Sequence, residues 1–287
     1  MKTYYPATES WMASFPKREI DSIWEKYLSK HGEPSKTKGV EEIEWHSLIE
    51  VLRSHDIKKI EMIIDKLAQG YFLLIKRVLD ENDLHQLNVN FSNFMNSEPS
   101  SFHKIHDGVP NFWRDITEEL STRYAVPQVK KTSYWFHWNE ASKDVYRLIM
   151  PIYRALKALG GKSPTEYENN IPSTGKVDRI QLVHYPAGTG KLDAHHDPKE
   201  SQRLIMSGYT TRRGVHFEGG GFWAQGINGE KIDMEPFLFP GDFGTCYANI
   251  VHGVDATNSG DRGFIGLYTV DSDYTAQRDT IRAASTS

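Results

Sequence analysis

The spacing of apolar residues in the first quarter of the chain predicts helices. Between Lys17 and Leu67, apolar side chains recur every three or four residues, which is the spacing of one helix face. Asp56 stands where an N-cap would begin a second helical stretch, and residues 31–39 have the Gly, Pro and Ser content of a loop. Residues 1–69 are therefore predicted to form a helical N-terminal extension.

The middle of the chain alternates between strand and helix patterns. Gly70 ends the helical spacing, and residues 71–78 form a short apolar run typical of a buried strand. Asp80 is a candidate helix cap, and further helices are predicted over residues 111–123 and 145–159, the last ending at Gly160. Between these two helices, residues 129–138 alternate as a strand does, which puts Tyr134, Phe136 and Trp138 on one side.

From residue 177 onwards the pattern changes to short strands separated by Gly, Pro and Asn-Gly turns. Short strands of this kind cannot each bury a face alone, and they fit a double-sheet jelly roll with helices packed against one sheet. The predicted class is α+β, with a double-stranded β-helix (jelly-roll, cupin-like) core and largely N-terminal helices. We expect one domain over residues 1–287, with the jelly-roll core and its supporting helices at 70–274 and a flexible tail at 275–287.

Composition narrows the class of protein. The 287 residues are 38% hydrophobic and 25% charged, as expected for a single globular unit. The net charge of −4 argues against nucleic acid as a partner. One cysteine, Cys246, allows no intramolecular disulfide, and no apolar run reaches the length of a signal peptide or a membrane span. We therefore expect a cytoplasmic protein; its oligomeric state is not predicted.

Three residues carry the pattern of a metal site. His195 and Asp197 are two residues apart, so an extended backbone puts both side chains on one face, while His196 points away. With the distant His252 they form the ligand set of a 2-His-1-carboxylate facial triad, which leaves iron positions open and is typical of oxygen chemistry at Fe(II). Arg262 follows His252 by ten residues, and its planar fork suits a carboxylate, which suggests a keto-acid co-substrate.

A histidine and an aspartate at this spacing are frequent by chance in a chain with twelve histidines. The specific signal is the ordered combination of this pair with His252, Arg262, the glycine run at residues 219–221 and the Pro-Gly-Asp turn at residues 240–242. Over residues 177–271 the chain resembles the Fe(II)/2-oxoglutarate-dependent dioxygenases, whose motif is H-x-D, a later H, and an R about ten residues on. The resemblance covers about the last third of the chain.

The resemblance implies Fe(II) bound by His195, Asp197 and His252, with 2-oxoglutarate and O2 as co-substrates. It implies that Arg262 holds the far carboxylate of 2-oxoglutarate and that Gln181 and Tyr185 lie beside the co-substrate, although Tyr185 fits a core aromatic equally well. Phe264 stands where some relatives have a serine, so Tyr209 is a candidate for the missing hydroxyl. The carboxylate of Asp197 favours oxygen transfer over halogenation, because halogenating relatives have a small residue there.

Substrate contacts are predicted from residue type. Arg203 is a candidate for an acidic substrate group, with a surface salt bridge as the alternative. Tyr134 and Trp138 are predicted to line the cavity opposite the iron, and Trp223 is either a substrate platform or a core residue. The preferred function is hydroxylation of a small molecule, such as an amino-acid-derived or specialised metabolite. The alternatives are a peptide or protein (prolyl-type) hydroxylase, a desaturase or cyclase with the same ligands, and a non-catalytic jelly-roll binding protein.

Overall fold

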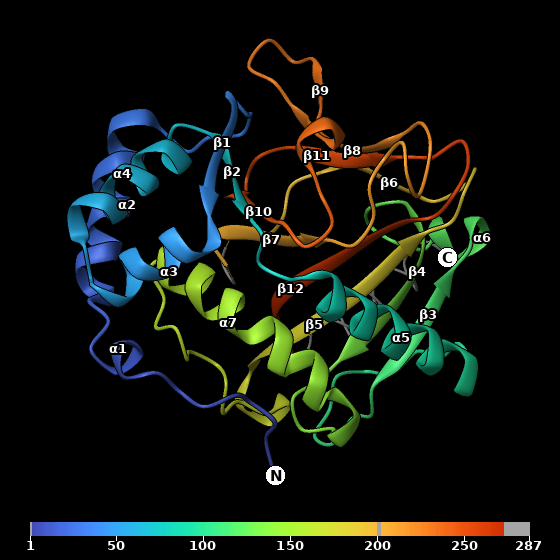
Figure 1. The fold of residues 1–287 in the computed structure, drawn as a ribbon. Helices are drawn as coiled ribbons and strands as arrows, with labels where there is room; N and C mark the ends of the chain where they lie inside the picture. Colours follow the sequence, from blue (N-terminus) through green and yellow to red (C-terminus); the bar gives the residue numbers. More distant parts are fainter. Residues whose placement is uncertain (1, 200–201, 273–287) are drawn as a thin grey trace.

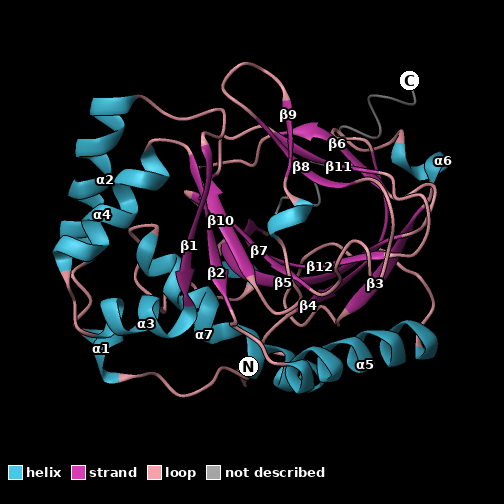
Figure 2. Ribbon diagram, turned by 45° about the horizontal axis from the view of Figure 1, so that its top comes forward, coloured by secondary structure: helices cyan, strands magenta, loops and turns pink. Residues whose placement is uncertain are grey.

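A computed structural model describes residues 2–199 and 202–272, which form two β-sheets facing each other, with helices outside the larger one (Figure 1, Figure 2). The larger sheet has the strand order β1, β2, β10, β7, β12, β5, β4, and β3 pairs with β4. Its strands are β1 (Gly39–Glu44), β2 (Tyr71–Lys76), β3 (Phe112–Ile116), β4 (Gln128–Trp135), β5 (Lys176–Tyr185), β7 (Leu204–Tyr209), β10 (Phe243–Tyr247) and β12 (Arg262–Asp271).

The smaller sheet continues from the first residues of β4. Gln128 and Val129 pair with β6, whereas residues 131–135 pair with β5, so β4 passes from one sheet to the other. The strands that follow β4 in this sheet are β6 (Lys191–His195), β11 (His252–Asp255), β8 (Gly221–Gln225) and β9 (Lys231–Asp233). Apart from the parallel pair β1 and β2, the pairings are antiparallel, and the predicted jelly-roll core is confirmed.

Helices cover the outer face of the larger sheet (Figure 2). The α-helices are α1 (Ser10–Ala13), α2 (Lys17–His31), α3 (Trp45–Arg53), α4 (Ile57–Ala68), α5 (Glu81–Ser97), α6 (Glu118–Ser121) and α7 (Lys143–Leu159), and the 3-10 helices are η1 (Glu140–Ser142), η2 (Pro172–Thr174) and η3 (Glu235–Phe237). Among the described residues, no helix combines the length and the apolar character needed to cross a membrane.

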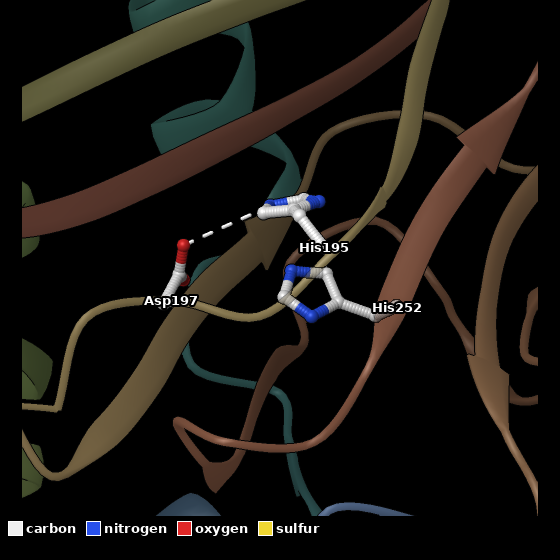
Figure 3. Close-up of side chains that lie close together, drawn as sticks. All are labelled: His195, Asp197 and His252. Atoms are coloured by element: carbon white, nitrogen blue, oxygen red, sulfur yellow. Dashed lines mark ion pairs between the residues drawn. The ribbon is translucent and has the colours of Figure 1, made fainter. Parts of the chain in front are cut away.

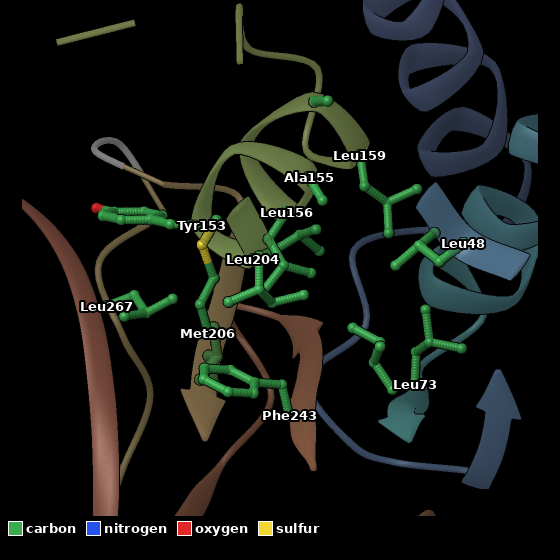
Figure 4. Close-up of a cluster of buried hydrophobic side chains, with 14 of the residues drawn as sticks. Leu48, Leu73, Tyr153, Ala155, Leu156, Leu159, Leu204, Met206, Phe243 and Leu267 are labelled. Carbon is green, nitrogen blue, oxygen red and sulfur yellow. The ribbon is translucent and has the colours of Figure 1, made fainter. Parts of the chain in front are cut away.

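The main hydrophobic core lies between α7 and the larger sheet (Figure 4). Leu156 and Leu159 of α7 pack with Leu204 and Met206 of β7 and with Phe243 of β10. Burying one such leucine or phenylalanine stabilises the fold by about 1.5–3 kcal/mol. Because side chains alternate along a strand, this packing turns the other residues of β7 towards the smaller sheet.

The inner faces of the two sheets enclose a smaller mixed interior. Val183 and Tyr185 of β5 and Phe264 of β12 form a buried cluster with Val254 of β11, and Phe222 of β8 packs against it. The strand register places Tyr209 opposite Phe264 and Arg262 opposite Tyr185. The polar side chains with predicted roles at Tyr185, Tyr209 and Arg262 therefore share this interior.

Most predicted elements are confirmed, including the caps. Asp56 accepts a hydrogen bond from the backbone N–H of Lys59 at 3.2 Å, and Gly160 follows the last residue of α7. The helix predicted over residues 111–123 is wrong, because β3 and the four-residue α6 occupy this segment. In β3, burial alternates with a period of two, so pairing with β4 decides the structure there.

The strand β1 was missed within the extension predicted to be helical. Its side chains are half-buried or exposed, so the sequence carries little of the alternation that identifies a strand. It pairs in parallel with β2 over its whole length and so joins the N-terminal segment to the larger sheet. The predicted flexible tail, 275–287, lies outside the described residues.

The cap of α5 gives a testable stability difference. Asp80 accepts from the backbone N–H of Asp83 at 2.9 Å, and the Asp83 carboxylate accepts from the backbone N–H of Asp80 at 3.4 Å. Asp80→Ala removes this capping box and should lower the free energy of unfolding by about 1 kcal/mol, measured by chemical denaturation. Glu81→Ala, one residue on, is the matched control, and an equal loss in both variants would contradict a specific role of the cap.

Two buried ion pairs anchor α7, one to a loop and one to β5. The Arg154 guanidinium donates to both carboxylate oxygens of Glu168 at 2.6 and 2.8 Å and also to the carbonyls of Pro6 and Ala7. Lys157 pairs with the buried Asp178, which also accepts from the hydroxyl of Tyr153. These charges lie outside the interior between the sheets and serve the fold.

Candidate metal centre and adjoining cavity

Two histidines and an aspartate converge where β6 ends and β11 begins in the smaller sheet (Figure 3). His195 is the last residue of β6 and lies directly opposite His252, the first residue of β11. Asp197 follows two residues later, where its backbone N–H donates to the carbonyl of Ala248 at 3.0 Å. The three side chains point towards one another (Figure 3), and strand pairing between β6 and β11 fixes the two histidines relative to each other.

The distances suit one metal ion. His195 Nε2 lies 3.7 Å from Asp197 Oδ1, and the two imidazole centroids are 4.3 Å apart. One nitrogen of each histidine and one oxygen of Asp197 all lie within 4.8 Å of one another. His196 is exposed, as the choice between the two neighbouring histidines predicted. The three predicted ligand residues are thus brought together by chain segments more than fifty residues apart.

Backbone carbonyls set the tautomer of both histidines. His195 Nδ1 lies 2.9 Å from the carbonyl of Asp193, and His252 Nδ1 lies 2.9 Å from the carbonyl of Ile250. A carbonyl only accepts, so each Nδ1 carries the proton, and each Nε2 keeps a lone pair. Metal-binding histidines are typically oriented by such a bond on the second nitrogen. Both rings are therefore arranged to offer Nε2 as a ligand.

Burial lowers the pKa of His195 to about 4, helped by the neighbouring His252 and opposed by the charge of Asp197. The ring therefore stays neutral at neutral pH in the protein without metal. Neutral imidazole is the form that binds a metal ion.

The same pKa predicts a dependence of stability on pH. In the unfolded chain His195 would titrate near 6.5. Below that pH the unfolded chain binds a proton that the folded protein does not bind, so the free energy of unfolding decreases as the pH falls from 6.5 towards 4. Between pH 7 and pH 5 the metal-free protein should lose on the order of 2 kcal/mol of unfolding free energy through this residue. Denaturation of wild type and His195→Gln at both pH values measures it, and an equal pH dependence in the two proteins would contradict it.

A cavity adjoins the three side chains and runs between the sheets. Apolar residues from both sheets form much of its wall: Leu192, Ile205, Phe222, Val254 and Phe264. Its polar lining consists of the candidate ligands and of Tyr185, Ser207, Tyr209, Arg262 and Tyr268. The cavity therefore combines a metal-binding edge, an apolar wall and a few polar groups, as small-molecule sites commonly do.

Arg262 is the buried cation of this cavity. It is 3% exposed, and its Nε donates to the carboxylate of Glu235 at 2.6 Å. Burial by itself lowers the pKa of Arg262, but the ion pair with Glu235 outweighs burial, so the pKa lies above its usual value. The guanidinium is charged, and it lines the cavity as a carboxylate-binding group would.

Two tyrosine hydroxyls face the same interior. In the part of the chain that the structure describes, the buried hydroxyls of Tyr185 and Tyr209 have no hydrogen-bond partner. Burial raises the pKa of both tyrosines, although the charge of Arg262 opposes the shift, so both remain protonated donors. A Cβ on Gly244 would lie 2.5 Å from the Tyr209 oxygen, so glycine leaves room for this hydroxyl. Buried donors without partners are uncommon, and these two line the cavity, where a ligand would accept from them.

Gln181 does not reach the cavity, although it shares a face of β5 with Tyr185. Its amide lies within hydrogen-bonding distance of Thr132 Oγ1 (3.3 Å) and of the Arg179 guanidinium (2.6 Å). Tyr134 belongs to the same region, where its ring lies 4.9 Å from the Arg179 guanidinium carbon. These residues form part of the inner face farther from Arg262.

The other predicted substrate residues also lie away from the lining of the cavity. Arg203 pairs with Asp21 of α2 at 3.1 Å and donates to the carbonyl of Gly160 at 2.7 Å, so it ties a helix to the sheet, as the salt-bridge alternative described. Trp138 is a core residue whose Nε1 donates to the carbonyl of Val109 at 2.7 Å. Trp223 lies on the opposite face of β8 from Phe222, with its Nε1 donating to Asp255 at 3.1 Å.

Glu235 was missed by the sequence analysis. The only signal is a carboxylate within the otherwise apolar stretch from Met234 to Pro240, and a glutamate is usually exposed. Its partner Arg262 is 27 residues away in sequence, so no local pattern connects the two.

No protein-family model and no curated protein matches the chain. Its fold resembles that of a prolyl-4-hydroxylase from Pseudomonas putida, with 13% identity over 74% of this chain and 98% of that one, at a TM-score of 0.50. It also resembles a protein from Neurospora crassa in complex with alpha-KG (2-oxoglutarate) and 5-formyluracil, with 12% identity over 81% of this chain and 84% of that one, at a TM-score of 0.52. These structures share the fold that the sequence resemblance predicts.

Proposed function

We propose that this protein is an oxygenase that uses Fe(II) and 2-oxoglutarate to hydroxylate an unactivated C–H bond of a small molecule. The observation that carries the proposal is the convergence of two histidine Nε2 atoms and one carboxylate at the edge of a cavity that also contains a buried arginine. A site with three protein ligands leaves positions for a co-substrate and for O2, unlike a structural site, which its protein ligands fill.

The donor set fits iron. His195 and His252 would bind the metal through Nε2, because carbonyls hold their Nδ1 protons, and Asp197 would supply the anionic ligand. Bound there, Fe(II) would supply the activation of O2, coupled to the decarboxylation of 2-oxoglutarate to succinate. Leu192, Phe222 and Val254 line this end of the cavity, and their apolar side chains would exclude bulk water from the reacting groups.

The cavity also fits 2-oxoglutarate, which has a carboxylate at each end. Arg262 would bind the distal carboxylate through its remaining N–H groups, and the hydroxyl of Tyr209 would donate a further hydrogen bond. Tyr209 would thereby provide the hydroxyl that is absent at Phe264. The hydroxyl of Tyr185, which lies opposite Arg262 on the neighbouring strand, would donate to the same co-substrate.

A small molecule is the preferred substrate because the cavity is lined by side chains from both sheets and binding there would surround the ligand. The Neurospora crassa protein, whose structure contains 5-formyluracil and alpha-KG, is an example of this fold with a small ligand. We place the substrate near Tyr268, which lines the cavity, in place of the contacts predicted at Arg203, Tyr134, Trp138 and Trp223.

The direct test is turnover of 2-oxoglutarate. The protein is loaded with Fe(II) and 2-oxoglutarate without oxygen, exposed to O2 with a panel of metabolites, and assayed for succinate and for oxidised product by mass. A gain of one oxygen atom identifies hydroxylation, whereas a loss of two hydrogens identifies desaturation or ring closure. If the Fe(II)-loaded protein neither binds 2-oxoglutarate nor releases succinate, the proposal is wrong.

Peptide prolyl hydroxylation is the second candidate, because the likeness to the Pseudomonas putida prolyl-4-hydroxylase extends over 98% of that chain. The same assay separates the two. Succinate release stimulated by proline-containing peptides, with a gain of one oxygen in the peptide and no stimulation by free metabolites, would favour the peptide enzyme.

A further inference from the structure

A buried carboxylate lies directly behind Arg262. Glu235 is the first residue of η3, and its side chain is 2% exposed. Its Oε1 accepts two hydrogen bonds, from Arg262 Nε at 2.6 Å and from the backbone N–H of Phe222 at 2.7 Å. Arg262 and Phe222 line the cavity, whereas Glu235 is absent from the lining that the described residues form. Glu235 therefore holds two residues of the cavity wall from outside.

Gly221, the last glycine of the run at residues 219–221, makes this contact possible. A Cβ on Gly221 would lie 2.5 Å from Glu235 Cγ and 2.6 Å from Oε1, and the φ of Gly221 is +107°, which side-chain-bearing residues rarely adopt. The backbone of β8 can therefore approach Glu235 closely enough for the Phe222 N–H to bind it. Gly221 thus has a definite role in holding a carboxylate against the arginine.

This contact determines which edge of the guanidinium faces the cavity. A guanidinium has five N–H donors in one plane, and Glu235 takes the one on Nε. Within the described ranges, Nη1 and Nη2 of Arg262 have no hydrogen-bond partner. The guanidinium carbon lies 5.9 Å from the ring centroids of both Tyr185 and Phe222, so aromatic rings flank the group. The backbone of β12, the Nε contact and these rings together restrict the orientation of the fork.

We propose that Glu235 is a positioning residue for the distal carboxylate of a 2-oxo diacid, a role that rests on the proposed function. Glu235 neutralises Arg262 when no co-substrate is bound and holds the Nη edge towards the cavity, so that the carboxylate binds without reorienting the arginine. Preorganisation of this kind lowers the cost of binding. The negative charge of Glu235 is not itself needed for the diacid to bind, because it repels the arriving carboxylate.

Two conservative variants separate position from charge. Glu235→Gln removes the charge and keeps a side-chain oxygen at the same distance from the backbone. Glu235→Asp keeps the charge but shortens the side chain by one methylene, which moves the carboxylate away from Arg262. The Kd of 2-oxoglutarate is measured by anaerobic calorimetry on Co(II)-loaded protein. We expect Glu235→Asp to raise this Kd at least about 10-fold and Glu235→Gln to leave it within about 3-fold of wild type or lower it. An unchanged Kd in Glu235→Asp, or equal weakening in both variants, overturns the proposal.

A second ligand and a control variant separate this role from general destabilisation. 2-Oxobutyrate lacks the distal carboxylate, so its Kd should be the same in wild type and in Glu235→Asp, and a parallel loss for both acids would indicate a merely structural role. Glu168→Gln disturbs the buried Arg154–Glu168 pair elsewhere and should lower the Tm without changing the Kd of 2-oxoglutarate. If wild type binds no 2-oxoglutarate, the proposed function fails; if wild type binds it and Glu235→Asp binds it equally well, only the role of Glu235 fails.

Discussion

Alanine in place of His195, Asp197 or His252 should abolish turnover and metal binding while leaving the fold intact. Each residue provides one of the three ligand atoms, which all lie within 4.8 Å of one another. Among the described residues, no further His, Cys, Asp or Glu side chain belongs to this group, so a lost ligand is not replaced. Loss of a hydrogen-bonding partner of a metal ligand typically weakens metal binding 10- to 100-fold, and loss of a ligand itself should exceed this. Metal stoichiometry after anaerobic Fe(II) loading and succinate release are the measurements.

The neighbouring His196 provides the matched control. It is exposed and stands outside the converging set, although it is next to a proposed ligand. His196→Ala should therefore keep the metal stoichiometry and turnover of wild type, and circular dichroism should be the same for all four variants. Full activity in one of the three ligand variants would remove that residue from the metal site.

The sequence predicted His195 and Asp197 as a pair because residues two apart on an extended segment share a face. His252, Tyr185 and Tyr209 were predicted from the family resemblance, and the strand register places both tyrosines in the interior. The helix cap at Asp80 and the helix end at Gly160 also depend only on neighbouring residues, and both are confirmed.

Alternation does not say how far along a strand the cavity extends. Gln181 and Tyr185 share the inner face of β5, yet only Tyr185 lines the cavity, because their positions along the strand differ by four residues. Arg203 lies away from the lining of the cavity for a different reason. Its partner Asp21 is 182 residues away, and the packing of α2 against the sheet, which brings them together, leaves no mark in the sequence around Arg203.

Replacing Arg262 should weaken the binding of 2-oxoglutarate selectively. The loss of charge-assisted hydrogen bonds to a carboxylate costs about 1.5–3 kcal/mol, so the Kd of 2-oxoglutarate should rise roughly 10- to 100-fold in Arg262→Gln. Arg262→Lys should recover only part of the affinity, because a single ammonium cannot reproduce the planar fork that also contacts Glu235. Metal affinity should change little, and so should the Kd of 2-oxobutyrate, which has no distal carboxylate.

Arg262→Ala alone is a poor test because it leaves Glu235 buried without its partner, and breaking a buried ion pair in this way costs about 3–5 kcal/mol. The double variant Arg262→Gln with Glu235→Gln removes both charges and leaves two amides that can hydrogen-bond to each other. Its unfolding free energy should lie closer to wild type than that of either single variant, while its Kd for 2-oxoglutarate stays as high as in Arg262→Gln. A double variant that folds well and binds 2-oxoglutarate as tightly as wild type would show that another group binds the distal carboxylate, and the hydroxyls of Tyr209 and Tyr185 would then be the candidates to test.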